Sequence, residues 1–170
     1  AYTTLNVNNS GASAGQTITL GYGNLGGPDF GILSGLAPTT VSYTFNDVRD
    51  VNLYCGSGAD TVNVLATGGI GMTLINGGGG EDVVNVGDAG YLGRVAATVR
   101  VVNPPAFTSV NVSGAGEGAA RTVNLDRVVV DSLDYGVLSG LAPMPIQYRF
   151  GDTRDVTVTT GTAADIVQIR

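Results

Sequence analysis

Residues 77–86 read GGGGEDVVNV, and the related residues 55–64 read CGSGADTVNV. Each stretch begins with glycines, continues through an Asp and ends in an apolar–Asn–apolar triplet. Glycine permits the positive φ angles of a tight turn. Alternating apolar and polar residues are typical of a half-buried β-strand. Both stretches therefore predict a turn that leads directly into a short strand.

The apolar–Asn–apolar triplet occurs six times in the chain. Its central residues are Asn6, Asn52, Asn63, Asn85, Asn111 and Asn124. Successive side chains of a strand point to opposite faces, so we expect the apolar pair to point inward and the Asn outward. The interval from Asn63 to Asn85 is twice the interval from Asn52 to Asn63, and residues 72–75, MTLI, fill its middle. This spacing predicts short, regularly spaced strands separated by glycine-rich turns.

A larger repeat organises the whole chain. Residues 2–64 align with residues 107–169 at a constant offset of 105, with 25 identities in 63 positions and no gap. We call them the first unit and the second unit, and residues 65–106 the spacer. We expect residues 1–170 to form one continuous segment, cut from a longer repetitive polypeptide.

The composition excludes several classes of protein. With 27 Gly in 170 residues and no Lys, the chain is poorly suited to helices. It has no His and one Cys, which excludes an internal disulfide and a Cys-based zinc site. A net charge of −6 argues against a nucleic-acid partner. No apolar run is long enough to cross a bilayer, which takes about 20 residues, so we expect no membrane span.

The sequence predicts an all-β protein and leaves two architectures open. The favoured one is a parallel β-solenoid, because the strands are short and uniform and the Asn triplets recur in near register. The chain also has only 11 aromatic residues, few for the core of a sandwich. The alternative is a β-sandwich repeat, for which the length of one unit with its spacer is also a natural size.

One motif suggests a metal ion. Residues 77–85 match the nonapeptide G-G-x-G-x-D-x-U-x in full, and residues 55–63 match it except at the first Gly. The motif resembles the calcium-binding β-roll repeats of RTX proteins, which implies Ca²⁺ ligands at Asp60 and Asp82, with Glu81 a third candidate. The two Asp residues are far apart in sequence, however, whereas RTX nonapeptides are usually tandem. The other interpretation is a plain turn in which Asp caps backbone amides.

The wider pattern of residues 50–87 resembles repeats in very large, calcium-binding-like surface and secreted proteins of bacteria, including planctomycetes. This resemblance implies an extracellular or cell-surface location. With no His or Lys, and with Asp residues that recur with the turns, we expect no catalytic activity.

Two functions remain. The first is a structural module of a bacterial surface, filament or matrix protein that associates end to end or with neighbouring repeats. The second is a calcium-stabilised, adhesin-type module that binds a glycan or a surface protein. For the second we expect binding at Phe30 and Tyr135, which precede the related blocks GILSGLAP and GVLSGLAP in segments predicted to be loops.

Overall fold

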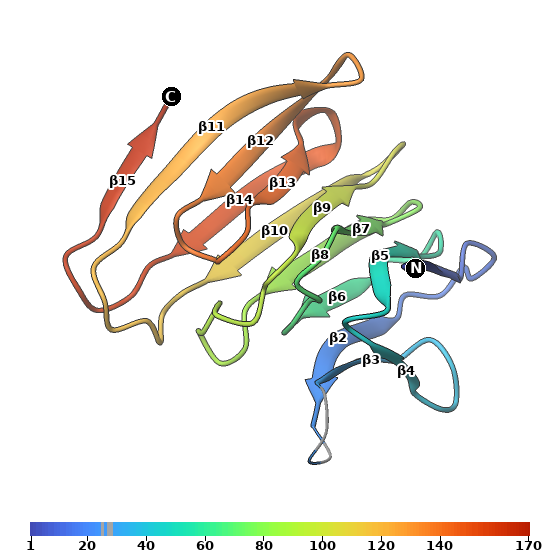
Figure 1. Cartoon of the computed structure of the whole chain (residues 1–170). Coiled ribbons are helices and arrows are strands. Elements are labelled where there is room, and N and C mark those ends of the chain that lie inside the picture. The colour runs from blue at the N-terminus through green and yellow to red at the C-terminus, as the bar shows by residue number, and fades with distance from the viewer. Residues whose placement is uncertain (25, 27–28) are drawn as a thin grey trace.

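The computed structural model describes residues 1–24, 26 and 29–170. It is an all-β structure with two sheets of mixed direction, neither of them closed (Figure 1). A short 3-10 helix, η1 (Phe150–Asp152), interrupts the strands. Among the described residues, no helix has the length and the apolar content that crossing a bilayer requires.

The eight-stranded sheet has the order β1-β5-β7-β9-β13-β12-β11-β15. Its strands are β1 (Thr3–Asn8), β5 (Val48–Tyr54), β7 (Met72–Asn76), β9 (Thr98–Val102), β13 (Ile146–Arg149), β12 (Leu133–Ser139), β11 (Thr122–Val130) and β15 (Ile166–Ile169). The seven-stranded sheet has the order β14-β10-β8-β6-β2-β3-β4. Its strands are β14 (Thr153–Thr159), β10 (Phe107–Ser113), β8 (Glu81–Val86), β6 (Thr61–Val64), β2 (Thr17–Gly23), β3 (Phe30–Ser34) and β4 (Val41–Thr44).

The chain alternates between the two sheets from β4 to β10, and strands of successive passes pair in parallel. Among the described residues, nine of the thirteen strand pairings are parallel. The four antiparallel pairings form two meanders, β2-β3-β4 and β11-β12-β13. The predicted all-β class is therefore confirmed, while the sheets are neither uniformly parallel nor the antiparallel sheets of a sandwich.

The meanders account for this mixture. The sequence predicted that the segments around GILSGLAP and GVLSGLAP leave the body of the protein as loops. Instead they continue the sheets as antiparallel strands, in which Leu33 and Leu138 are each 1% exposed. Glycine makes this packing possible, because the Tyr43 ring lies where a side chain of Gly31 would be, and a Cβ there would overlap with the ring.

The strand pattern predicted from the Asn triplets is confirmed. In β6, Val62 and Val64 are buried, whereas Asn63 between them is half-buried on the outer face. Pairing places Asn63 opposite Asn85, and Asn85 opposite Asn111. The amides form a ladder: Asn85 Nδ2 donates to Asn63 Oδ1 at 3.0 Å, and Asn111 Nδ2 donates to Asn85 Oδ1 at 3.0 Å.

Equivalent strands of the two units lie in opposite sheets. The first unit places β1 and β5 in the eight-stranded sheet and β2, β3, β4 and β6 in the other. The second unit places their counterparts β10 and β14 in the seven-stranded sheet and β11, β12, β13 and β15 in the eight-stranded one. The exchange follows from the spacer, which adds three strands between β6 and β10 and so reverses the alternation.

Candidate functional site

The Asp residues of the glycine-rich turns are buried and accept hydrogen bonds from backbone amides. Asp60 is 2% exposed. Its Oδ1 accepts from the Gln16 amide at 2.7 Å, and its Oδ2 accepts from the Gly56 amide at 3.1 Å. One carboxylate therefore joins its own turn to the turn that precedes β2, which is the capping role of the plain-turn interpretation.

Asp82 continues this arrangement into the next turn. Its Oδ1 accepts from the Asp60 amide at 2.7 Å, whereas its Oδ2 is buried and has no partner among the described residues. Burial raises the pKa of Asp82 to about 6, against the lowering effect of the hydrogen bond from the Asp60 amide, and the Asp60 carboxylate raises it further. A buried, partly satisfied carboxylate favours its protonated form.

Asn103, the residue directly after β9, accepts a hydrogen bond from the turn that contains Gly79. It is fully buried, and its Oδ1 accepts from the Gly79 amide at 3.0 Å. A Cβ on Gly77 would overlap with Asp82 Oδ2 and lie 2.6 Å from Asn103 Oδ1. Glycine is therefore required at position 77 because two side-chain oxygens converge on it.

Cys55 lies beside the same carboxylates. Its side chain is fully buried, and burial, together with Asp60 and Asp82, raises the pKa of the thiol to about 12. A thiol that stays protonated is a poor nucleophile. Cys55 therefore acts as a small core residue.

The structure brings Asp60 and Asp82 together but places Glu81 elsewhere. The exposed Glu81 carboxylate pairs with Arg154 of β14, which lowers the pKa of Glu81. Three of the four carboxylate oxygens of Asp60 and Asp82 accept backbone amides, which leaves Asp82 Oδ2 for a cation. Ca²⁺ takes six to eight oxygen ligands, so this donor set alone does not fit it. Within the described residues, no three His, Cys, Asp or Glu side chains form a metal-binding group.

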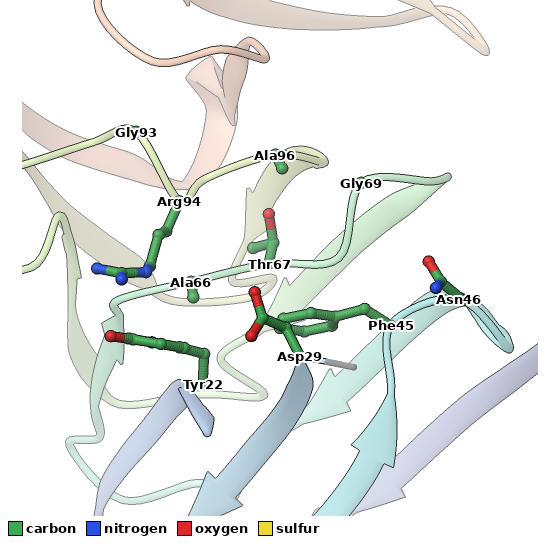
Figure 2. Close-up of a pocket in the computed structure, with 10 residues that line it drawn as sticks. All are labelled: Tyr22, Asp29, Phe45, Asn46, Ala66, Thr67, Gly69, Gly93, Arg94 and Ala96. Atoms are coloured by element: carbon green, nitrogen blue, oxygen red, sulfur yellow. The ribbon is translucent and has the colours of Figure 1, made fainter. Parts of the chain in front are cut away.

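A pocket of about 420 Å³ lies where the first unit meets the spacer (Figure 2). Its lining combines aromatic, charged and small residues from β2, the residues on either side of the β3-β4 hairpin, and two spacer loops. These are Tyr22, Asp29, Phe45, Asn46, Ala66, Thr67, Gly69, Gly93, Arg94 and Ala96. An aromatic wall with a few polar groups is typical of small-molecule sites.

The charged groups of this pocket are available to a ligand. The Arg94 guanidinium stacks on the Tyr22 ring, with its carbon 3.8 Å from the ring centroid (Figure 2). In the part of the chain that the structure describes, Arg94 has no carboxylate at ion-pair distance. Asp29 Oδ1 accepts from Asn24 Nδ2 at 2.6 Å, and within the described ranges the other carboxylate oxygen has no donor. Hydroxyl groups could bond to both side chains while a sugar ring packs on the aromatic wall.

The aromatic residues that the sequence singled out lie outside this pocket's lining. Phe30 is half-buried at the start of β3, with its ring packed over Gly23 of the adjacent strand. Tyr135 is 6% exposed, and its ring lies 5.0 Å from the guanidinium carbon of Arg100. Neither ring forms an open platform, so any binding at these two residues is still a prediction. Sequence reasoning missed Tyr22 and Arg94, which are distant in sequence and share no motif.

The protein was also compared with known proteins. No family model, no curated protein and no solved structure matches the chain.

Proposed function

We propose that the chain is a non-catalytic structural module of an extracellular bacterial surface, filament or matrix protein, which associates end to end. The observation that carries this proposal is the exposure of apolar residues of β15 whose equivalents in the first unit are buried in the core. Val167 and Ile169 of β15 are 53% and 82% exposed, whereas the equivalent Val62 and Val64 of β6 are 1% and 0% exposed. A strand edge with exposed apolar side chains is a template for pairing with another chain.

The central strands support a solenoid-like stack in this module. Val62 of β6 pairs with Val84 of β8, and Val84 in turn pairs with Val110 of β10. Each such interval takes the chain once through each sheet. In solenoid proteins, each repeat buries its apolar face only by stacking on its neighbours. The stack grows along one axis, with like residues in register, so its length can increase without a change of fold.

The roles of the acidic side chains agree with a scaffold. Asp60 and Asp82 accept backbone amides of the turns, and Asp50 accepts from the Met72 amide at 3.1 Å. These carboxylates hold successive turns together. The extracellular location is inferred from the resemblance of residues 50–87 to bacterial surface repeats.

Analytical ultracentrifugation across a wide concentration range tests this function. We expect the mean mass to rise with concentration without any ligand. Covering Val167 and Ile169 would stabilise the contact by about 1.5–3 kcal/mol for each fully buried side chain. Ile169→Asp should abolish the rise, whereas Val129→Asp, at a 60% exposed position in the β11-β12 hairpin, should not. A wild-type chain that stays monomeric throughout would refute end-to-end association.

The pocket at Tyr22 and Arg94 favours a second function, an adhesin-type module that binds a glycan. It offers an aromatic wall, a carboxylate and a guanidinium in one cavity of about 420 Å³. This volume is within the range for small-molecule sites, roughly 300–1,000 Å³. The residues that support this function are Tyr22, Phe45, Asp29 and Arg94 of the pocket.

Isothermal titration with a panel of neutral hexoses and their short oligomers tests this second function. Asp29 and Arg94 are exposed, so Asp29→Asn and Arg94→Ala should leave the fold intact and weaken binding at least tenfold. Arg127→Ala is the matched control. Arg127 stands in the second unit at the position equivalent to Tyr22, but its exposed guanidinium pairs with Asp134 and does not line this pocket. This function would be refuted if the wild-type protein gave no binding heat with any sugar, or if all the variants gave the same heats as the wild type.

A further inference from the structure

We propose that each open end of the stack is completed by a further three-stranded segment of the spacer type, so that units and spacers alternate along one axis. This inference rests on the proposed structural function and names the partner of the open ends. The N-terminal end consists of the outer edges of β1 and β4, and the C-terminal end consists of those of β14 and β15.

The C-terminal end has a covered counterpart inside the same molecule. In the first unit, β5 pairs with β7 and β6 pairs with β8, so both edges are covered by spacer strands. Their equivalents β14 and β15 are the last strands of their sheets. The core positions respond accordingly: Val51 and Leu53 of β5 are 4% and 0% exposed, whereas Val156 and Val158 of β14 are only half-buried.

The N-terminal end shows the same relation in reverse. In the second unit, spacer strand β8 covers β10 and spacer strand β9 covers β13. Their equivalents β1 and β4 end their sheets. Val112 of β10 is 2% exposed and Ile146 of β13 is 1% exposed, whereas the equivalent Val7 is half-buried and Val41 is 36% exposed.

The geometry favours a spacer over the bare end of a second copy. Between the two units, the spacer contributes β7 and β9 to one sheet and β8 alone to the other. Strands lie about 4.8 Å apart within a sheet. Another copy could instead pair its β4 with β14 and its β1 with β15 directly. Compared with a stack that contains a spacer, one sheet would then lack two strands and the other sheet would lack one. The two sheets would then be out of step by about one strand. The bare end of a second copy can therefore pair with one edge at a time, whereas a spacer fits both edges together.

The internal pairing also gives the register. In β6 and β8, Val62 lies opposite Val84, Asn63 opposite Asn85 and Val64 opposite Val86. A further spacer on β15 would place its own Val-Asn-Val triplet opposite Val167, Gln168 and Ile169. The Asn of that triplet would then lie opposite Gln168, as Asn85 lies opposite Asn63. A unit after that spacer would return its strands to the sheets that the first unit occupies, because three more strands reverse the alternation again.

The test extends the full chain with a second copy of residues 66–106 after Arg170, which is the repeat equivalent of Leu65. Each protein also carries Ile169→Cys, and a water-soluble thiol reagent measures its reactivity. Position 169 is 82% exposed in the chain without the extension. The native Cys55 is fully buried, so it should contribute little to the labelling. We expect the extension to slow labelling about tenfold or more, since the thiol then reacts only when the added strands open.

The control extension has the same length but carries Asp at its counterparts of Val84 and Val86. It should leave the Ile169→Cys thiol as reactive as it is in the unextended chain. Fast labelling with the unaltered extension would overturn the inference, whether the added residues fold elsewhere or stay unfolded. The ultracentrifugation result is independent, because a chain can be monomeric at every concentration and still be protected by a covalently joined spacer. Protection without self-association would refute end-to-end association alone, and self-association without protection would refute the spacer alone.

Discussion

The first and second units share 25 of 63 residues and the same order of strands, yet equivalent positions differ greatly in burial. Leu20 of β2 is fully buried, whereas the equivalent Leu125 of β11 is half-buried. Val64 is 0% exposed, whereas the equivalent Ile169 is 82% exposed. The strand pattern therefore determines which face a side chain takes, whereas the neighbouring strands determine whether that face is covered.

The largest expected effect comes from testing this comparison with identical substitutions. Leu20→Ala should lower the free energy of unfolding by about 3 kcal/mol, since it leaves a cavity in a closed core. Leu125→Ala should cost about 1 kcal/mol, because that side chain is still partly in water. Urea denaturation measures both. Equal losses would show that the second unit is covered in solution, by self-association or otherwise, and repeating the measurement at several protein concentrations distinguishes these cases.

Asp82, in the glycine-rich turn of the spacer, makes the free energy of unfolding depend on pH. The pKa of Asp82 is about 6 in the folded chain, against an ordinary value of 3.8. The folded state therefore binds this proton more tightly than the unfolded state, so the Asp82 contribution is fully present below about pH 4. It is lost as the pH rises through 6, and the loss amounts to about 3 kcal/mol.

Asp82→Asn should flatten this part of the stability curve, because the amide oxygen can still accept from the Asp60 amide while no charge forms. Chemical denaturation at pH 4, 5, 6, 7 and 8 measures the difference between wild type and variant. A wild-type stability that follows the variant over this whole range would contradict a raised pKa at Asp82.

The turn carboxylates sharpen the comparison at a smaller scale. Asp60 accepts two backbone amides, whereas its equivalent Asp165 accepts the Arg121 amide at 2.8 Å and has its Oδ2 unpartnered among the described residues. Asp60→Ala should destabilise by about 2 kcal/mol and Asp165→Ala by about 1 kcal/mol, since each orphaned buried amide costs about 1–3 kcal/mol. Thermal unfolding measures both, and a larger loss at Asp165 would reverse the assignment.

The smallest expected effect concerns calcium. Three of the four carboxylate oxygens at Asp60 and Asp82 are occupied by amides, so millimolar Ca²⁺ and chelator should give the same melting temperature. A bound ion at a hundred times its dissociation constant would instead stabilise the fold by about 2.7 kcal/mol. A rise with Ca²⁺ that is absent in Asp82→Ala would establish the calcium-stabilised module and remove the plain-turn interpretation.

Much of the architecture could be predicted from local pattern. The apolar–Asn–apolar triplets predicted the strands and the inward and outward faces of their side chains. The Gly-x-Gly-x-Asp stretches gave the turns. These features depend on residues close in sequence, whose periodicity matches that of a strand.

The candidate sites were less accessible. Phe30 and Tyr135 were expected to bind a ligand because each precedes a predicted loop. Those segments pair as antiparallel strands, and binding at the two residues stays a prediction. The pocket instead combines Tyr22 with Arg94, and contacts between distant segments leave no periodic signal in the sequence.

By itself, the sequence determined the all-β class, the repeat, the alternation of faces and the positions of the glycine-rich turns, because each can be read from residue types and their spacing along the chain. Only the tertiary structure decided the exchange of the two units between sheets, the pocket at the spacer and the raised pKa of Asp82. The tertiary structure also determined that Val64 is buried while Ile169 is exposed. These properties depend on which strand lies beside which, and the desolvation of a side chain is set by those neighbours.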